Sequence, residues 1–200
     1  MLDDTTAMDQ RRAPEYIIEV FADPSSVRDV VRGILHTIFF HRFFSSIRPT
    51  SCDVLDLTLP QVKDEQLETL IDQRTAALVR QLDTSSDISR QNSGVRGLMA
   101  VQFFEKKRRK AWFTKAEEEV CWERWTLDIT LATPRTESER AKVRKAMENT
   151  LLKAAMKIVT TANTEKDHIP PITTSEANPF PYIITINPKG DGWGTRMGIF

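Results

Sequence analysis

The histidines are the side chains in this sequence most suited to metal binding or proton transfer. His36 and His41 fall in one predicted helix, where about 100° of rotation per residue places them roughly 140° apart. They therefore do not converge on one metal ion or one proton. His36 lies beside the apolar face and is predicted to be a core histidine with satisfied ring nitrogens. His41 and Arg42 complement the dipole at the helix end, or else contact a partner.

The cysteines, carboxylates and glycines form no catalytic pattern either. Cys52 precedes a predicted strand and Cys121 begins one, so both are expected to be buried small side chains. The adjacent glutamates 117–119 do not face one another and have basic neighbours, which favours a solvated loop. The alternating glycines of the stretch GDGWG precede no predicted helix that would hold a phosphate. We therefore expect no enzyme, no metal site and no cofactor.

Charge and hydropathy narrow the class of protein further. The 200 residues include 28 basic and 28 acidic side chains, and this balance argues against a dedicated nucleic-acid or anionic-membrane binder. The longest apolar run, residues 34–44, is broken by polar side chains and is far shorter than the roughly 20 residues of a membrane span. The first residues lack the apolar core of a signal peptide, and the cysteines form no CxxC pair. A cytosolic globular domain is expected.

Five consecutive cations carry the strongest local charge, namely Lys106, Lys107, Arg108, Arg109 and Lys110. Such a run is typical of a solvated hairpin end, of a contact with an acidic partner or lipid surface, or of a nucleic-acid contact. The neutral total and the glutamates that follow favour the first interpretation over the other two.

An adjacent pair of aromatic residues, Trp112 and Phe113, stands among these charges. Neighbours in an extended segment point to opposite sides, so burying both rings requires the loop to form a compact packed unit. Otherwise the rings project outward and another molecule covers them. Hiding one ring of roughly 150–250 Å² is worth several kcal/mol at about 25 cal/mol per Å². Because tryptophan is enriched at interface hot spots, the pair favours a binding function.

The elements that position these residues begin with a strand at 15–21, which Asp23 and Pro24 end by capping a helix. Helical periodicity follows at residues 27, 30, 31, 34, 35, 38 and 39. A strand at 52–59 and a helix capped by Asp64 lead to a polar linker at 83–94. The strands predicted at 97–107 and 121–132 form a hairpin that carries the basic run and the aromatic pair.

A capping box at Thr136 and Glu139 opens a third helix that reaches about residue 161, and a last strand covers 182–187. The order β-α-β-α-β-β-α-β predicts an α+β domain with a mainly antiparallel sheet packed against three main helices. We expect this domain to span residues 15–187, between a flexible N-terminal tail at 1–14 and a C-terminal tail at 188–200.

Three segments of the chain carry a resemblance to a known family. They are ILHTIFFHR at 34–42, WFTKAEEEVCWERWTLDI at 112–129, and the HIPPI and PFPYIITI blocks between 168 and 186. Together they resemble the autophagy-related protein 101 family, whose members are HORMA-domain subunits of the complex that initiates autophagy. The resemblance implies a single HORMA domain and a non-catalytic adaptor that heterodimerises with the HORMA domain of autophagy-related protein 13 and stabilises it.

The same resemblance implies roles for particular residues. Trp112 and Phe113 correspond to an exposed aromatic finger that recruits downstream factors at the phagophore assembly site, although animal members carry a proline between the two rings. The heterodimer surface is expected on the third helix and nearby, with the candidates His41, Arg42, Arg140, Arg144, Lys145 and Glu148. The alternative is a peripheral membrane module that uses the basic and aromatic loop. With a short tail after the last strand, one locked HORMA topology is expected.

Overall fold

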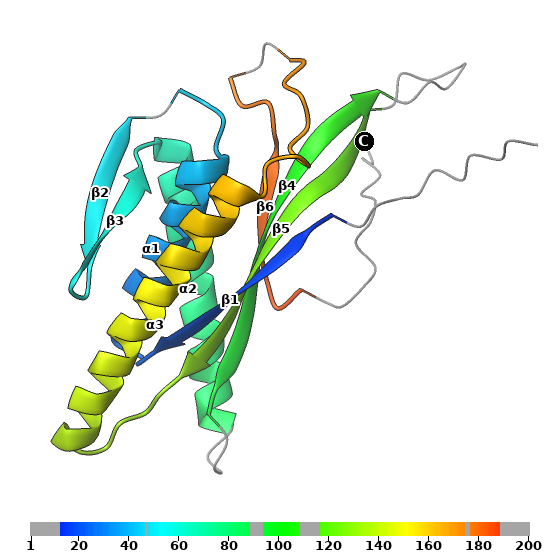
Figure 1. The fold of residues 1–200 in the computed structure, drawn as a ribbon. Helices are drawn as coiled ribbons and strands as arrows, with labels where there is room; N and C mark the ends of the chain where they lie inside the picture. Colours follow the sequence, from blue (N-terminus) through cyan, green and yellow to red (C-terminus); the bar gives the residue numbers. More distant parts are fainter. Residues whose placement is uncertain (1–12, 47, 89–93, 109–116, 175–176, 189–200) are drawn as a thin grey trace, which may run out of the picture.

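The computed structural model describes residues 13–46, 48–88, 94–108, 117–174 and 177–188. In these ranges the chain forms an α+β fold with a four-stranded sheet, a two-stranded sheet and three helices (Figure 1). The elements, in chain order, are β1 (Glu15–Ala22), α1 (Val27–Arg42), β2 (Pro49–Val54), β3 (Leu57–Val62), α2 (Glu65–Ile88), β4 (Arg96–Arg108), β5 (Glu117–Leu131), α3 (Glu137–Thr164) and β6 (Tyr182–Ile186).

The main sheet has the strand order β1-β5-β4-β6. Strand β4 runs antiparallel to both of its neighbours, whereas β1 runs parallel to β5, so the prediction of a mainly antiparallel sheet is confirmed. The β4–β5 pairing is the longest and continues to Arg108 opposite Glu117, with a bulge between Phe103 and Phe104. Strands β1 and β6 therefore form the two edges.

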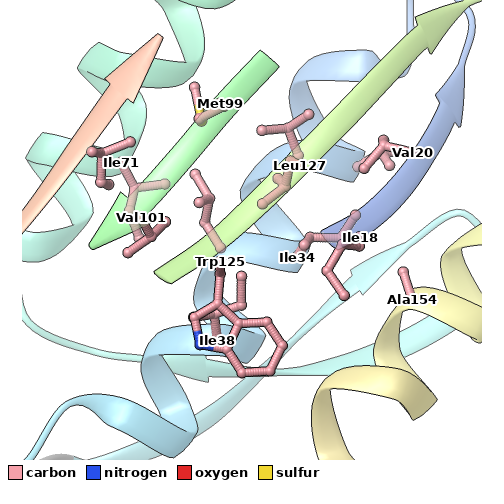
Figure 2. Packing of buried hydrophobic residues seen from close by; sticks show 14 of the residues in the cluster. Ile18, Val20, Ile34, Ile38, Ile71, Met99, Val101, Trp125, Leu127 and Ala154 are labelled. Carbon is pink, nitrogen blue, oxygen red and sulfur yellow. The ribbon is translucent and has the colours of Figure 1, made fainter. Parts of the chain in front are cut away.

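The core lies between the main sheet and the helices, which cover one of its faces (Figure 1). Side chains from β1, β5 and α1 point into a common interior (Figure 2) that includes Ile18, Val20, Ile34, Ile38, Trp125 and Leu127. The apolar residues predicted for the first helix are all buried. Each such side chain contributes about 1.5–3 kcal/mol when it leaves water, so α1 is held mainly by this face.

The single strand predicted at 52–59 is wrong, because the segment forms the β2–β3 hairpin. The chain reverses at Leu55, whose φ of 54° is unusual for a residue other than glycine. The hairpin packs closely on Gly33 of α1, where an added Cβ would lie 2.9 Å from a Leu59 methyl and 3.0 Å from a Val54 methyl. Glycine at this position allows the hairpin to approach the helix.

Two of the three N-terminal caps predicted from the sequence are observed in the structure. Asp64 Oδ1 accepts a hydrogen bond from Leu67 N at 2.9 Å, and the capping box of Thr136 and Glu139 opens α3, as predicted. The predicted cap at Asp23 is wrong, because α1 begins at Val27. Asp23 instead accepts a hydrogen bond from Ser26 N at 2.8 Å and stabilises the turn before the helix.

Helix α2 continues to Ile88, where the sequence predicted a polar linker from residue 83. The hydroxyls of Thr84 and Ser85 donate to the carbonyls of Arg80 and Gln81, both at 2.9 Å, which lie one turn earlier in the helix. Serine and threonine can therefore remain within the helix instead of ending it. Their polarity alone gave the wrong prediction.

His36 is fully buried, as predicted, but its ring nitrogens are not satisfied. Neither nitrogen has a hydrogen-bond partner among the residues that the structure describes. Burial and, to a smaller extent, the Arg32 cation lower the pKa of His36 to about 4, against the opposing effect of the Asp72 carboxylate. The folded protein therefore contains a neutral imidazole at pH 7.

This histidine makes stability depend on pH. Between the folded pKa of about 4 and the ordinary value of 6.5, the unfolded chain binds the proton and the folded chain does not. The contribution of the neutral His36 to the free energy of unfolding is therefore fully present above pH 6.5. It decreases as the pH falls towards 4, by on the order of 3 kcal/mol. The variant His36→Leu should lose this part of the dependence in urea unfolding at pH 4.5 and 7.5. If the free energy of unfolding changed equally with pH in the wild type and the variant, this role of His36 would be contradicted.

Candidate partner-docking surfaces

The β4–β5 hairpin was predicted to carry the aromatic finger and the basic run. Trp112 and Phe113 lie outside the described residues, as do Arg109 and Lys110. Beyond the bulge at Phe103 and Phe104, the two strands stay paired up to Arg108 and Glu117, so residues 109–116 connect two paired strand ends. The structure thus describes the support of the predicted finger and not the finger itself.

The described end of the hairpin places opposite charges across from one another. Lys106 pairs in register with Glu119, and Lys107 with Glu118. Lys107 Nζ also lies 2.7 Å from the Glu105 carboxylate on its own strand. The glutamates therefore belong to β5 and not to the solvated loop that the sequence predicted. Because they oppose the basic run, they locally balance the positive field that a lipid anchor would need.

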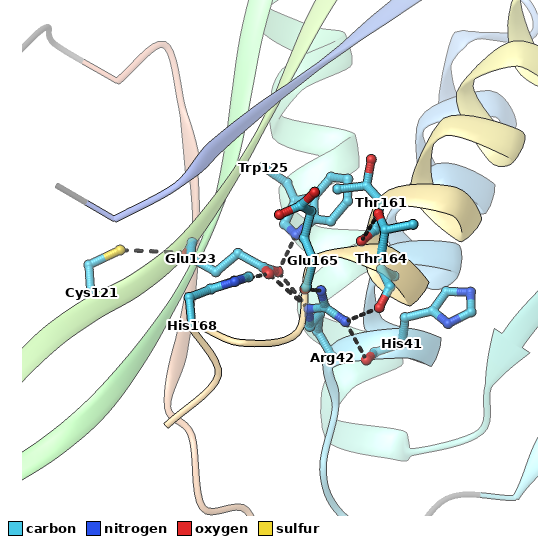
Figure 3. A network of polar contacts seen from close by, with 10 residues as sticks. His41, Arg42, Cys121, Glu123, Trp125, Thr161, Thr164, Glu165 and His168 are labelled. Carbon is cyan, nitrogen blue, oxygen red and sulfur yellow. Dashed lines mark hydrogen bonds and ion pairs between the residues drawn. The ribbon is translucent and has the colours of Figure 1, made fainter. Parts of the chain in front are cut away.

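At the base of the hairpin, the buried Glu123 carboxylate is held by three side chains (Figure 3). Arg42 Nε donates to both of its oxygens, at 2.8 and 2.9 Å. Trp125 Nε1 donates to Oε1, and His168 Nε2 lies 2.7 Å from Oε2. We call these four residues the Glu123 network. It joins α1, β5 and the segment after α3.

Arg42 also satisfies the end of α3. Its Nη1 donates to the Ala162 carbonyl at 3.2 Å and its Nη2 to the Glu165 carbonyl at 3.0 Å. Carbonyls at a helix C-terminus lack partners within the helix, and a cation is favourable there. With 3% of its side chain exposed, Arg42 does not lie on the surface, so its predicted place in a heterodimer surface is wrong.

His41, the neighbouring candidate, is only half-buried, and its ring packs edge-on against Phe40 with centroids 5.5 Å apart. Burial lowers its pKa, and so does the Arg42 cation. Because His41 is partly exposed in the last turn of α1, it remains a candidate for a partner contact.

Sequence reasoning missed the Glu123 network, although one signal was present. Glu123 shares the phase of Trp125 and Leu127, whose side chains point into the core. A carboxylate on the apolar phase of a strand calls for a buried partner. The position of that partner, 81 residues earlier at the end of α1, has no local signal.

The bulge beside this network is filled by Trp122, which is buried. Its ring centroid lies 5.7 Å from that of Phe103, 5.2 Å from Phe180 and 5.7 Å from His168. A bulge bends its strand and increases the local twist. Here the aromatic contacts fix the bend, and with it the direction in which the outer hairpin leaves the sheet.

On α3, the predicted interface residues are at the surface. Arg140, Arg144 and Lys145 are exposed, and Glu148 is half-buried. Arg144 donates to Glu148 at 3.0 Å and to Asp56, in the turn of the β2–β3 hairpin, at 2.9 Å. This second contact ties the first half of α3 to the neighbouring hairpin.

Two apolar residues on α3 that the sequence analysis did not select are also exposed. Leu152 is 47% exposed and Met156 is 57% exposed. At about 100° per residue, both point within roughly 20° of Lys145 and away from the buried stripe that contains Met147 and Ala154. In the sequence, these two residues are an apolar pair spaced i, i+4 outside the buried stripe, and this spacing could have identified them. We call Arg144, Lys145, Glu148, Leu152 and Met156 the α3 face.

The cysteines are the remaining candidates for chemistry. Cys52 and Cys121 are free and half-buried, so the prediction of full burial is not met. Desolvation by burial raises the pKa of both thiols, which keeps them protonated at neutral pH. Within the described ranges, no three metal-binding side chains gather at one point. The described helices include none with the length and apolar character to cross a bilayer.

Comparison with known proteins gives a consistent set of relatives. A model of the family "Autophagy-related protein 101" matches residues 19–176. Curated proteins of that name are 27% identical in Arabidopsis thaliana, over 86% of each chain, and 27% identical in Schizosaccharomyces pombe, over 84% of each. The Homo sapiens protein is 26% identical, over 79% of this chain and 75% of its own.

The Glu123 network should dominate the stability of this region. The variant Glu123→Gln keeps the side-chain volume but leaves the buried Arg42 cation without its counter-charge, which we expect to cost about 3 kcal/mol or more. The matched change Glu119→Gln, at a half-exposed position of the same strand, should cost less than about 1 kcal/mol. Urea unfolding followed by circular dichroism compares the two. Similar losses would show that the buried pair has no special weight.

Proposed function

The chain belongs to the autophagy-related protein 101 family, and we propose that it is a non-catalytic adaptor in autophagy initiation. In this role its α+β fold is a HORMA domain, which pairs with the HORMA domain of autophagy-related protein 13 and stabilises that partner. Trp112 and Phe113 recruit downstream factors to the initiation kinase complex. The adaptor acts in the cytoplasm and is recruited to the phagophore assembly site.

The α3 face is the observation that carries this proposal. It has an apolar centre, Leu152 and Met156, that its own chain leaves largely exposed. Charged side chains surround that centre, among them Arg144 and Lys145. An apolar centre with a polar rim is the usual anatomy of a protein interface. Full burial of such a side chain from water is worth about 1.5–3 kcal/mol, and the half of each that is still exposed would contribute roughly half of that to a pair.

Contacts within the chain position the α3 face before any partner arrives. Arg144 bonds the first half of the helix to Asp56, and Arg42 bonds the carbonyls at its end. Side chains and elements that are already ordered lose less entropy on association. This pre-organisation supports α3 as the surface for the heterodimer.

The hairpin supports a separate recruiting role. Figure 1 shows the β4–β5 hairpin extending to the upper right, away from α3 on the left of the fold. A partner on α3 would therefore leave the hairpin end accessible. The membrane alternative has less support, because the glutamates of β5 oppose Lys106 and Lys107 in register.

Truncating the apolar centre should weaken the heterodimer. We expect the double variant Leu152→Ala with Met156→Ala to lose at least about tenfold in affinity for the HORMA domain of autophagy-related protein 13, because two buried side chains are shortened. Isothermal titration calorimetry measures this loss. The matched control is Ile172→Ala, an exposed apolar residue outside α3, which should bind like the wild type. Equal affinity in the double variant and the control would reject the α3 face.

The finger should be separable from pairing. The double variant Trp112→Ala with Phe113→Ala should keep the thermal stability of the chain and its affinity for autophagy-related protein 13, yet reduce autophagic flux in cells that lack the native protein. The physical reason is that the rings contact another molecule and not the core. A fall in the melting temperature of several degrees, or loss of the heterodimer, would show that the rings support the fold instead.

A further inference from the structure

The side of the main sheet that faces away from the helices is closely covered along β4. Strand β4 contributes three side chains to the core beneath the helices, namely Met99, Val101 and Phe103. Since successive residues of a strand point to opposite sides, Ala100, Gln102 and Phe104 lie on the other side of the sheet. We call this side the back face. The three helices and the β2–β3 hairpin all lie on the core side (Figure 1).

The side chains of the back face are as buried as those of the core. Ala100 is 0% exposed, Gln102 is 3% exposed and Phe104 is 6% exposed. Side chains stand roughly perpendicular to a sheet, so neighbouring strands alone do not hide a phenyl ring. These fractions belong to a single chain, yet none of its described helices or strands lies over these residues (Figure 1).

Gln102 also has an unsatisfied polar atom on the back face. Its Nε2 lies 3.9 Å from Cys121 Sγ, which is a weak contact. Its Oε1 acceptor is buried and has no hydrogen-bond partner in the part of the chain that the structure describes. A buried amide oxygen without a donor costs free energy. A backbone N–H of a segment lying across the back face would supply this donor.

We propose that residues 189–200 of this chain dock on the back face and cover it. The chain reaches this face directly after β6. Asn187 N donates to the Leu98 carbonyl and Asn187 Oδ1 accepts from Leu98 N, both at 2.8 Å. Leu98 has the phase of Ala100 and is partly exposed, so it lies at the border of the back face. At Asn187 a φ of 44° turns the chain out of the strand direction.

The segment 189–200 is long enough for this role. From Leu98 to Phe104, β4 makes six residue steps, which span about 20 Å at roughly 3.3 Å per residue. Twelve extended residues reach about 40 Å. The segment can therefore follow β4 along the whole back face and still cross to the neighbouring strands.

Its composition also fits an apolar face. The large apolar residues of this segment are Trp193, Met197, Ile199 and Phe200, and only three of its twelve side chains are charged. The competing segment, residues 1–12, has no aromatic residue and five charged side chains. Burial of Phe104 beside Ala100 calls for apolar cover, which residues 189–200 provide better.

Docking of this segment does not compete with the α3 face, because α3 lies on the core side of the sheet (Figure 1). Its physical effect is to hide apolar surface that would otherwise be open to a second copy of the chain. The segment thus leaves the heterodimer surface accessible while it closes the opposite side of the domain.

Cys121 provides a direct measure of this cover. It pairs in register with Phe104, and Figure 3 shows its side chain on the side of β5 away from the helices. The sequence contains two cysteines, so the substitution Cys52→Ser leaves Cys121 as the single thiol. Its rate of reaction with Ellman's reagent in this background reports access to the back face.

Removal of residues 189–200 should raise this rate at least about tenfold, because an uncovered thiol is more accessible and more readily ionised. Removal of residues 1–12, a segment of equal length, is the matched control and should change the rate less than about twofold. A synthetic peptide of residues 189–200 should slow the reaction of the shortened chain again. The same peptide with Trp193→Ser and Phe200→Ser should not. Circular dichroism and pairing with autophagy-related protein 13 check that both shortened chains fold.

Equal rates in the two shortened chains, or a larger rise after removal of residues 1–12, would overturn the proposal. So would a wild-type chain that is dimeric by analytical ultracentrifugation and reacts faster on dilution, since a second copy would then cover the back face. If the shortened chain does not fold, the full-length variant Trp193→Ser with Phe200→Ser decides by the same rate. A failure here leaves the adaptor role intact, because heterodimer formation is measured separately through Leu152 and Met156.

Discussion

The buried ion pair of Arg42 and Glu123 is the constraint on which the arrangement of this domain depends. Moving each of two charges out of water costs several kcal/mol. Their attraction offsets this cost only when they lie close together and further hydrogen bonds satisfy their remaining polar atoms. Here Arg42 also bonds the carbonyls at the end of α3, while Trp125 and His168 complete the shell of Glu123. The pair therefore specifies where α1, α3 and β5 meet, because any other packing would leave a charge buried alone.

Both surfaces proposed for the adaptor are positioned by this meeting point. The end of α3 is fixed by Arg42, so the exposed pair Leu152 and Met156 has a defined orientation. The hairpin leaves the sheet beside Glu123, at a bulge packed by Trp122. A domain of this size can thus position two separate surfaces, since binding needs surfaces whose geometry is fixed in advance.

The sequence predicted those elements whose apolar residues repeat with a clear period. The i, i+3, i+4 pattern identified α1, and local cap chemistry identified the start of α3 at Thr136. Local polarity misled at Thr84, which bonds within α2, and the β2–β3 turn at Leu55 was not recognised inside the predicted strand. The docking surfaces were only partly predictable. Lys145 was visible as an exposed charge, but the burial of Arg42 depends on a partner distant in sequence, which no periodicity reveals.

The parallel pairing of β1 with β5 has a consequence for how the chain matures. Glu15 lies opposite Arg124, so strand β1 leaves the ribosome more than a hundred residues before its neighbour exists. Contacts of such long sequence separation form slowly, because closing the intervening loop costs entropy before any bond forms. Meanwhile the apolar face of β1, with Ile18 and Val20, stays unpaired in the nascent polypeptide. Strand β1 is therefore the segment for which a chaperone would compete during synthesis.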